Sequence, residues 1–388
     1  MKAYLDNSAT TPLDPLVLAE LERVYNNVPG NASSLYSLGL EAEQELKRCR
    51  ETLAGFLGVS AKEIYFASGG TETNNLAIWG AASARRRQGK HLITTAVEHP
   101  SVLRVFQALE EEDWQVTYLP CDREGKIQPR RLQAAVRDDT VLVSTMFVNN
   151  ETGAIAPLAE LSRVLRERKQ GLPLWHVDAV QGFGRLEIKP SELGIDLLSL
   201  SGHKIHAPKG VGALYCRSGV HLKPLFHGGQ QEHALRPGTE NVAGIAALRK
   251  AAELAFTARE TTIKRLGQFK TRLRACAESC GGIVNGPLDE TAAPYILNLS
   301  FPGVPAEVLL HSLDAREIYV STGSACSSRQ KTPSHVLSAM RVDQDQLKSA
   351  VRLSLSRLTR EEEVEYACQV LPQVVAELRA IYGARSQH

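Results

Sequence analysis

The chain has 388 residues, of which 43% are hydrophobic and 23% charged, and its formal net charge at pH 7 is +2. This length suffices for a large buried core divided between two or three domains. The near-neutral charge excludes a strongly basic nucleic-acid-binding surface, and no apolar run approaches the roughly 20 residues of a membrane-spanning helix. The seven cysteines lie at scattered spacings unlike a disulfide framework, and the N-terminus does not resemble a signal peptide. We therefore expect a cytoplasmic protein.

Short apolar runs alternate with longer amphipathic stretches between about residues 60 and 250. The runs predict buried strands, and several of the stretches between them predict helices. We expect strands at residues 64–66, 92–95, 116–119, 141–145, 175–177 and 197–200, and helices at residues 72–84, 100–112 and 158–169. This alternation is typical of a mostly parallel sheet that is covered by helices on both faces.

The C-terminal part of the chain has a different pattern. We expect a long helical stretch from about residue 250 to Cys280, a final helix at residues 361–382, and strands at residues 296–301, 318–320 and 351–355. We therefore predict an α/β fold with two domains. Residues 15–250 would form the large domain, and residues 1–14 and 251–388 a smaller α+β domain.

Glycines and polar residues follow the predicted strands, which is where open α/β sheets bind their ligands. The first strand leads into Ser68-Gly-Gly-Thr-Glu72, whose glycines and free helix N–H groups could hold a phosphate. The second leads to His99, whose flat ring could stack on a pyridine and whose pKa suits proton transfer. The ordinary alternatives are a turn with a helix cap and a surface histidine.

Asn150 and Asp178 follow two later strands. Asn150 could donate a hydrogen bond to a phenolate oxygen, or it could be a turn residue. A carboxylate at position 178 could keep a pyridine nitrogen protonated, which makes the ring an electron sink. A helix cap is the alternative for Asp178.

Lys204 follows the last of these strands, in Ser201-Gly-His-Lys204. A lysine at the end of a buried strand is costly unless it is paired or chemically engaged. A Schiff base to pyridoxal 5′-phosphate (PLP) would engage it, whereas the alternative is a loop lysine that points into water. Five of these strand ends thus present an anion-binding loop, an imidazole, an amide, a carboxylate and a lysine. Together they favour a PLP site over five unrelated loops.

Further motifs extend along the whole chain. They are Tyr4-Leu-Asp-Asn-Ser-Ala-Thr-Thr11, Gly30-Asn31, Ser68-Gly-Gly-Thr-Glu72, Glu98-His99, Asn149-Asn-Glu151, His176-Val-Asp-Ala-Val-Gln181, Ser201-Gly-His-Lys204, Pro208-Lys-Gly-Val-Gly212, Arg236-Pro-Gly-Thr239 and Ser324-Ala-Cys326. In these motifs the chain resembles cysteine desulfurases of the NifS/IscS type, within the class V aminotransferase-like group of fold-type I PLP enzymes.

The resemblance implies a role for each of these strand-end residues. Lys204 would bind PLP covalently, His99 would stack on its ring and Asp178 would pair with the pyridine nitrogen. The remaining contacts would be made near the phenolic oxygen by Asn150 and Gln181, and to the phosphate by Gly70, Thr71, Ser201 and His203. Thr239 would bind the phosphate in the neighbouring subunit, so the resemblance also implies a homodimer.

Cys326 lies among small and polar residues, between a predicted strand and a helix that begins near Pro333. Such neighbours predict an exposed loop, whereas free cysteines are more usually buried. The helical or strand contexts of the others fit burial: Cys49, Cys121, Cys216, Cys276, Cys280 and Cys368. The pair at positions 276 and 280 supplies too few ligands for a structural zinc site, and we predict no metal.

An exposed thiol suits a sulfur acceptor. Cys326 would attack the sulfur of a bound L-cysteine and retain it as a persulfide while alanine leaves. Its thiolate could be favoured by His99 or by the substrate amine. Arg352, on a predicted strand, would clamp the substrate carboxylate with Asn31 assisting, and a solvated arginine is the alternative.

The chain departs from the family pattern at a few positions. Tyr36 stands where histidine is frequent, Pro237 stands where serine is frequent, and residues 228–233 contain fewer glycines than usual. None of these changes removes a catalytic group, although Pro237 bears on how Thr239 reaches across a dimer. The loop after Cys326 has the longer form of NifS/IscS-like enzymes rather than the shorter SufS-like form.

We therefore expect a PLP-dependent cysteine desulfurase that passes sulfur to an acceptor protein, such as an iron–sulfur scaffold or a protein of thio-cofactor synthesis. Two other enzymes share the PLP site: a selenocysteine lyase and a class V aminotransferase. A non-enzymatic alternative is a sulfur-relay or docking subunit of a cluster-assembly complex. An assay of the amino-acid product distinguishes them, because only a desulfurase releases alanine from cysteine without a keto acid.

Overall fold

The computed structural model describes residues 1–167, 173–323 and 333–383. A seven-stranded sheet forms the larger part, in the order β2-β8-β7-β6-β5-β3-β4. Its strands are β2 (Ile64–Ala67), β3 (His91–Thr95), β4 (Gln115–Leu119), β5 (Thr140–Met146), β6 (Leu174–Asp178), β7 (Leu197–Ser201) and β8 (Gly212–Cys216). β8 runs in the direction opposite to the other six strands of this sheet, so the predicted mostly parallel sheet is confirmed. The six predicted strands are present to within one residue at each end.

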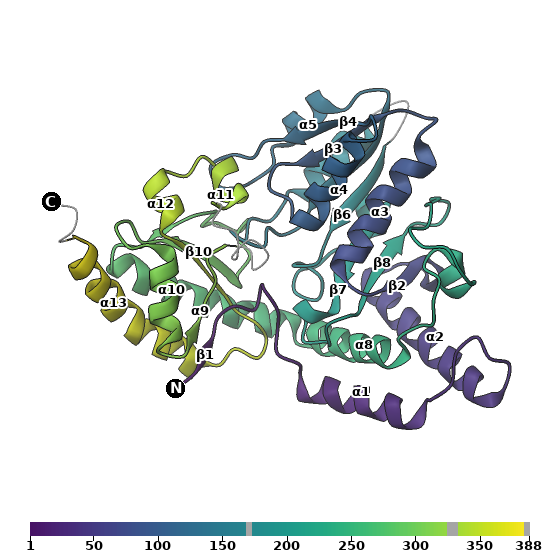
Figure 1. Ribbon diagram of the computed structural model, residues 1–388, viewed down its shortest axis with the longest axis horizontal. Helices are drawn as coiled ribbons and strands as arrows, with labels where there is room; N and C mark the ends of the chain where they lie inside the picture. The colour runs from purple at the N-terminus through teal and green to yellow at the C-terminus, as the bar shows by residue number, and fades with distance from the viewer. Residues whose placement is uncertain (168–172, 324–332, 384–388) are drawn as a thin grey trace.

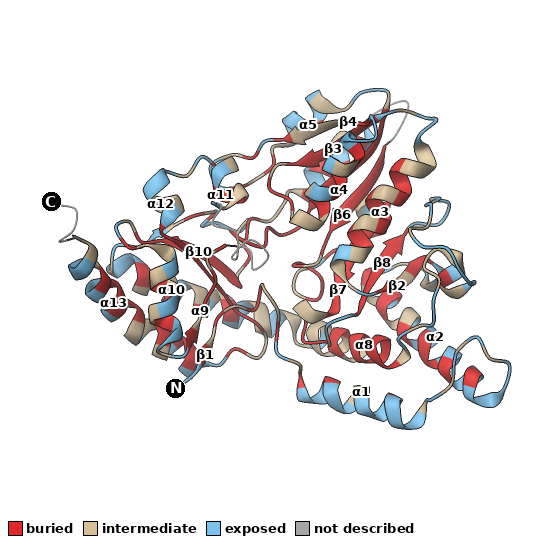
Figure 2. Cartoon of the chain, viewed as in Figure 1, coloured by how far each residue is buried: buried red, intermediate tan, exposed pale blue. Residues whose placement is uncertain are grey.

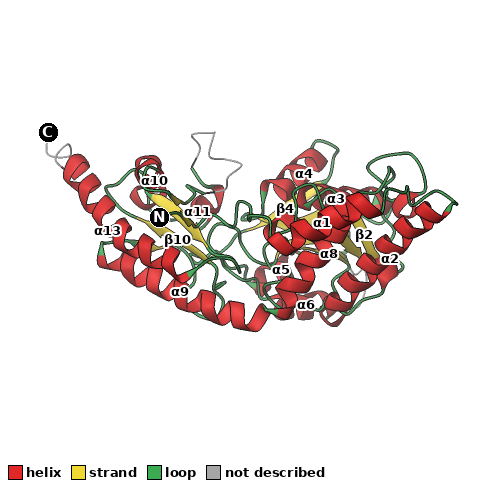
Figure 3. Ribbon diagram, turned by 90° about the horizontal axis from the view of Figure 1, so that it is seen from below, coloured by secondary structure: helices red, strands yellow, loops and turns green. Residues whose placement is uncertain are grey.

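Alternate residues of the central strands belong to different hydrophobic clusters. Leu92 and Leu142 pack with residues of α3 and α4, whereas Ile93 and Val143 pack with residues of α2, α5, α6 and α8. The helices are α2 (Ser37–Leu57), α3 (Gly70–Arg85), α4 (Pro100–Glu110), α5 (Pro129–Ala135), α6 (Leu158–Arg166) and α8 (Val242–Thr257). Because successive side chains of a strand point to opposite faces, the sheet is covered on both (Figure 3). This explains why its strands read as continuous apolar runs.

Two smaller sheets lie beside the large one (Figure 1). In the first, β10 (Ile296–Ser300) pairs antiparallel with β9 (Ile283–Val284) and β12 (Ala350–Ser354). In the second, β1 (Ala3–Tyr4) pairs parallel with β11 (Ile318–Tyr319). The N-terminal strand thus joins the C-terminal part of the chain. The two-domain division at residues 15 and 250 stays a prediction.

The helical stretch expected up to Cys280 is interrupted. Ala258, with φ of −96° and ψ of 6°, separates α8 from α9 (Arg259–Ser279). The expectation of one helix is wrong because the two segments pack in different places: α8 against α1 (Pro15–Asn27) and α2, and α9 against α13 (Glu361–Gly383). The remaining elements are α7 (Pro190–Leu193), α10 (Ala306–Asp314), α11 (His335–Ala339), α12 (Gln344–Lys348) and the 3₁₀ turns Ala61–Glu63, Gly202–Lys204 and Gln231–Ala234.

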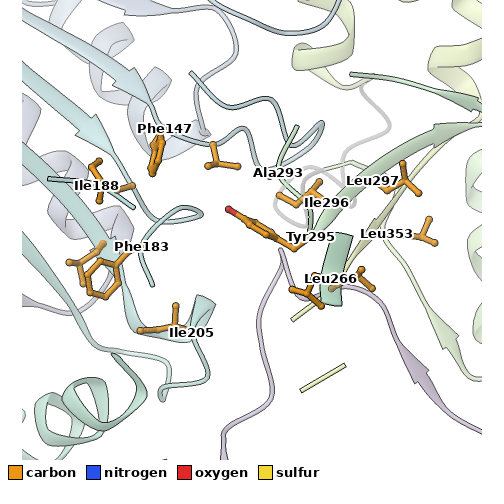
Figure 4. Packing of buried hydrophobic residues seen from close by; sticks show 14 of the residues in the cluster. Phe147, Phe183, Ile188, Ile205, Leu266, Ala293, Tyr295, Ile296, Leu297 and Leu353 are labelled. Carbon is orange, nitrogen blue, oxygen red and sulfur yellow. The ribbon is translucent and has the colours of Figure 1, made fainter. Parts of the chain in front are cut away.

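Tyr295 lies where the two parts of the molecule meet (Figure 4). It is fully buried, its hydroxyl donates to the carbonyl oxygen of Gln181 at 2.9 Å, and the Arg185 guanidinium lies 4.6 Å from its ring centre. Phe147 and Phe183 lie on the large-sheet side of the ring, and the residues of β10 and β12 lie on the other. Figure 2 shows that the strands on both sides are almost entirely buried. One continuous core therefore holds the two sheets together.

None of the described helices combines the length and the apolar character required to cross a membrane.

Candidate active site

A cavity of about 450 Å³ lies beyond the carboxyl ends of β5, β6 and β7. Its lining includes ten of the predicted site residues: Gly70, Thr71, His99, Asn150, Asp178, Gln181, Ser201, His203, Lys204 and Arg352. The N-terminal residues Ser8, Ala9 and Thr10 complete one side. Carboxyl ends of parallel strands meet at one edge of a sheet, and this brings side chains together that are far apart in the sequence.

One end of the cavity is shaped to receive an anion. Gly69 precedes α3 with φ of 149° and ψ of −173°, a conformation that only glycine adopts without strain. A Cβ atom on Gly70 would lie 2.8 Å from a methyl of Val180, and one on Gly212 would lie 2.7 Å from Cα of Gly69. The glycines therefore bring the backbone and the free N–H groups of the α3 N-terminus close to the cavity. Ser201 lies against the same turn, which is suited to a phosphate.

Lys204 points toward the N-terminal segment. Its Nζ donates to the carbonyl oxygens of Ser8 at 2.6 Å and Ala9 at 2.8 Å. The segment is itself held against the turn after β7, because the backbone N–H of Thr11 donates to the His203 carbonyl at 3.0 Å. The alternative in which Lys204 points into water is therefore wrong. The lysine lies in the cavity with its amine oriented by two carbonyls.

Asp178 is the last residue of β6, and both of its carboxylate oxygens accept hydrogen bonds. The N–H of Val180 donates to Oδ1 at 2.9 Å, and Nδ2 of Asn74 donates to Oδ2 at 2.8 Å. Burial raises the pKa of Asp178, while these two donors and the charge of Lys204 act in the opposite direction. A buried carboxylate held by neutral donors remains able to pair with a cationic ring nitrogen.

His99 is the N-cap of α4, and Pro100 takes the first helical position, as proline often does. Its Nδ1 lies 2.8 Å from Oγ of Ser101 and accepts from the backbone N–H of Ser101 at 3.1 Å. Burial, followed by the charges of Lys204 and His335, lowers the pKa of His99 to about 4. The ring is therefore neutral near pH 7.

Arg352 enters the cavity from β12, on the side opposite to the large sheet. Its side chain is 1% exposed, so the alternative of a solvated arginine is wrong. Nη2 pairs with Oδ1 of Asp6 at 2.6 Å, Nη1 donates to the carbonyl oxygen of Asn150 at 2.9 Å, and Nε has no partner among the described residues. A guanidinium that lines the cavity has the planar N–H arrangement suited to a carboxylate.

Three predicted site residues are not in this cavity. Asn31 is exposed, and its side-chain oxygen accepts from the N–H of Ser33 at 2.9 Å. Thr239 is also exposed, although Arg236 in the same turn pairs with Glu72 of α3 at 2.9 Å. Cys326 lies outside the described residues.

The two segments that flank residues 324–332 are both bonded beside the cavity. Ser321 exchanges backbone hydrogen bonds with Arg352. Ser334 donates from its hydroxyl to Oε2 of Glu151 at 2.5 Å, next to Asn150 in the chain. The described chain on each side of residues 324–332 is therefore held close to residues that line the cavity.

Sequence reasoning missed four contributors to the cavity and its lining. Asn74 contacts Asp178, Ser101 contacts His99, and Asp6 pairs with Arg352. Ser8 lines the cavity, and its hydroxyl is buried without a partner among the described residues. For two of them the available signal was spacing, because Asn74 is one helical turn after Gly70 and Ser101 is two residues after His99. Asp6 and Ser8 lie in the Tyr4–Thr11 motif, in which they had been given no role. Within the described ranges no three His, Cys, Asp or Glu side chains are grouped as for a metal ion.

The sequence matches the Aminotransferase class-V family over residues 3–367. It is 43% identical over 382 residues to "Cysteine desulfurase IscS" of Dictyoglomus turgidum, covering 98% of this chain and 96% of that protein. The fold is similar to the solved structure of a "NIFS-LIKE PROTEIN", with 36% identity and a TM-score of 0.92 over 97% of this chain and 100% of that one. A structure described as "SspA in complex with cysteine" is 33% identical, with a TM-score of 0.81 over 91% and 99%.

Proposed function

The chain belongs to the class-V aminotransferase family and, within it, to the cysteine desulfurases, and from this premise we propose how it acts on its substrate. The protein is a PLP-dependent enzyme that converts L-cysteine to L-alanine and transfers the sulfur to Cys326. The observation that carries this proposal is the convergence of Lys204, Asp178 and His99 with a glycine-lined helix N-terminus in one cavity.

The residues of the cavity fit PLP in charge and in shape. The N-terminus of α3, with Gly70, Thr71, Ser201 and His203, would hold the phosphate. Asp178 would hold the ring nitrogen, with Asn150 and Gln181 near the phenolic oxygen, His99 against the ring face and Lys204 as the covalent attachment. When bound, PLP supplies an electron sink that stabilises negative charge at the substrate's α-carbon.

Side chains and backbone of the protein bind the substrate, move a proton and limit the entry of water. Arg352, which lines the cavity, would bind the substrate carboxylate through its guanidinium, and its pairing with Asp6 keeps the guanidinium in place. Nζ of Lys204 takes the proton from the α-carbon, because it is the basic group fixed above the strand ends. The segment that contains Ser8 and Ala9 closes one side of the cavity and limits the entry of water.

The sulfur step takes place between two thiols. The Cys326 thiolate attacks the sulfur of the substrate, an S–S bond forms and the bond from that sulfur to Cβ breaks. The bonding electron pair stays with Cβ, which gains a proton, so that cysteine and one thiol become alanine and one persulfide. The flanks of residues 324–332 support this role because both are bonded beside the cavity.

A product assay on the wild type and on Cys326→Ser tests the proposal. With a reducing thiol present, the wild type is expected to release alanine and sulfide in equal amounts from L-cysteine, without a keto acid. Cys326→Ser should still give a cysteine-dependent change in the cofactor absorbance but no persulfide or sulfide. Sulfide released by Cys326→Ser at the wild-type rate would exclude the role of Cys326. A requirement for a keto acid would favour an aminotransferase, and activity confined to selenocysteine would favour a lyase.

The homodimer and the sulfur acceptor are further parts of the proposal. Thr239 is exposed in its own subunit, in a turn fixed to α3 through Arg236 and Glu72, and this supports a contact with the phosphate site of a second subunit. Several large apolar side chains near the start of α2 are also exposed, as at a subunit interface: Leu35, Tyr36, Leu38 and Leu40. The acceptor would be a cytoplasmic protein such as an iron–sulfur scaffold.

Mixed dimers test the shared site. Co-expression of a Lys204→Ala subunit with a Thr239→Ala subunit should give hybrids that contain one intact site and one doubly altered site. The hybrids are expected to recover activity that neither parent dimer has. A monomer in analytical ultracentrifugation would contradict the shared site.

A further inference from the structure

A chain of hydrogen bonds connects Asp178 to His99 through two residues that the reaction itself does not use. Nδ2 of Asn74 donates to Oδ2 of Asp178 at 2.8 Å and to Oγ of Ser101 at 2.9 Å. Oγ of Ser101 lies 2.8 Å from Nδ1 of His99. The four side chains come from three elements, since Asp178 ends β6, Asn74 lies in α3, and His99 and Ser101 lie at the start of α4.

The orientation of the Asn74 amide follows from the charge of Asp178. An ionised carboxylate only accepts hydrogen bonds, so the group 2.8 Å from Oδ2 must be the NH₂ of the amide and not its oxygen. Both amide hydrogens are then used, one toward Asp178 and one toward Ser101. The amide oxygen is buried without a partner among the described residues, which is costly for a buried acceptor. The opposite orientation would place two acceptors against each other.

The hydroxyl of Ser101 has one hydrogen to donate. It accepts from Asn74 and therefore donates its own hydrogen to Nδ1 of His99. The backbone N–H of Ser101 donates to the same Nδ1 at 3.1 Å. A neutral imidazole nitrogen that accepts from two donors carries no hydrogen, so the hydrogen of the ring is on Nε2.

We propose that Asn74 and Ser101 are positioning residues that hold His99 in the Nε2–H tautomer and make that tautomer depend on the negative charge of Asp178. The relevance to catalysis rests on the proposed function, which assigns His99 and Asp178 to the PLP site. The tautomer itself is a property of the protein and can be measured independently of turnover.

Two consequences follow for His99. Its Nε2 presents a hydrogen-bond donor and cannot accept a proton, while protonation at Nδ1 would require both bonds from Ser101 to break. The charged and titratable groups that act on the ring from other elements are Lys204 and His203 in the turn after β7 and His335 in α11. These groups all disfavour a positive charge on the His99 ring, and so do the two hydrogen bonds that Ser101 donates to Nδ1. His99 therefore remains a neutral donor throughout the neutral pH range.

The test is ¹⁵N NMR of histidine-labelled, full-length, PLP-loaded protein and of the protein without PLP. The His99 signals are identified by their loss in His99→Gln. In the wild type we expect one form between pH 6 and 8, with the hydrogen on Nε2. Asn74→Leu should give a mixture of both tautomers. Ser101→Ala should raise the pH at which the ring protonates by about 0.5 to 1 unit, because one donor to Nδ1 is lost. Ser101→Thr, which keeps the hydroxyl, should restore the wild-type signals.

Kinetics provide the second readout. Asn74→Leu and Ser101→Ala are each expected to lower kcat about fivefold with little change in KM for cysteine. Ser101→Thr should recover kcat, and Ser279→Ala, an exposed serine on α9, should match the wild type. The proposal is overturned if wild-type His99 carries its hydrogen on Nδ1, or if Ser101→Ala changes neither the tautomer signals nor kcat. If instead the His99 signals respond as expected but cysteine is not desulfurated, the proposed function fails, whereas the proposed control of the His99 tautomer by Asn74 and Ser101 stands.

Discussion

The cavity has two walls that are built in different ways. The strand-end wall (Gly69, His99, Asp178 and Lys204) comes from the large sheet, and its charged groups are oriented by neutral hydrogen-bond partners. The β12 wall is formed by Arg352, to which Asp6 and Ser321 are bonded. It holds one buried cation through an ion pair, and Ser321 precedes the segment that contains Cys326. Under the proposed function the two walls would have separate roles: the first would bind the cofactor, and the second would bind the substrate and lead to the cysteine that receives its sulfur. Changes in the two walls should therefore have different kinetic signatures.

The largest effect is expected from Lys204→Ala in the strand-end wall. Activity should fall by about 10²–10⁴-fold or more, because the basic group and the covalent attachment are lost together. Borohydride treatment, followed by mass spectrometry, should attach the cofactor to the wild type and not to the variant. Lys209→Ala, which alters an exposed lysine near the cavity rim, is the comparison for a general loss of positive charge. A cofactor adduct on another lysine would contradict the assignment.

In the β12 wall, Arg352→Lys should act on substrate binding. Lysine keeps the charge but loses the planar fork, so KM for cysteine should rise about 10- to 100-fold while the cofactor spectrum stays unchanged. Steady-state kinetics and absorbance spectra measure the two effects. Arg357→Lys, which alters the arginine paired with Asp14 outside the cavity, is the matched control and should leave KM unchanged. A loss of bound PLP in Arg352→Lys would contradict the assignment of cofactor binding and substrate binding to different walls.

Gly69→Ala tests the shape of the strand-end wall without changing any charge. The φ of 149° at this position should cost an alanine about 1–3 kcal/mol of strain, and the turn that presents the helix N–H groups should shift. Because about 1.4 kcal/mol corresponds to a tenfold change in affinity, we expect PLP affinity to fall roughly tenfold in a fluorescence titration. Gly55→Ala on α2 is the control, because a Cβ there meets nothing within 4 Å and alanine favours the helix. Equal PLP affinity in both variants would argue against the glycine turn as the phosphate site.

The last prediction concerns pH and three buried histidines at or behind the strand-end wall. Burial lowers the pKa of His99 and of His203 to about 4, and the pKa of His176, behind Asp178 on β6, to about 3. These rings stay neutral in the folded protein at pH values where the same histidines in the unfolded chain, with a pKa of about 6.5, bind protons. The contribution of these rings to the free energy of unfolding is therefore fully present above pH 6.5. It is lost as the pH falls toward 4, by up to about 1.4 kcal/mol per pH unit for each ring. Urea unfolding at a series of pH values measures the slope. Substitution of His176 by Asn should reduce it, whereas replacing the exposed His227 by Gln should not.

The sequence by itself determined the sheet and the content of the strand-end wall. The central strands are buried on both faces, so their apolar runs are unbroken and their bounds can be located to within one residue. Each run ends in a group whose chemistry is unusual for a loop, and parallel strands bring such ends together. This is why the residues at five strand ends could be predicted to share a site.

Only the tertiary structure decided how these groups are oriented. Asn74, Ser101 and Asp6 lie on a helix, in a helix first turn and in an N-terminal segment, and each acts on a residue at least two positions away that no periodicity selects. The break between α8 and α9 at Ala258 likewise depends on which neighbours the two helices find. A local sequence pattern indicates whether a side chain is buried. A hydrogen bond between segments that are far apart in the sequence depends instead on how the whole chain packs.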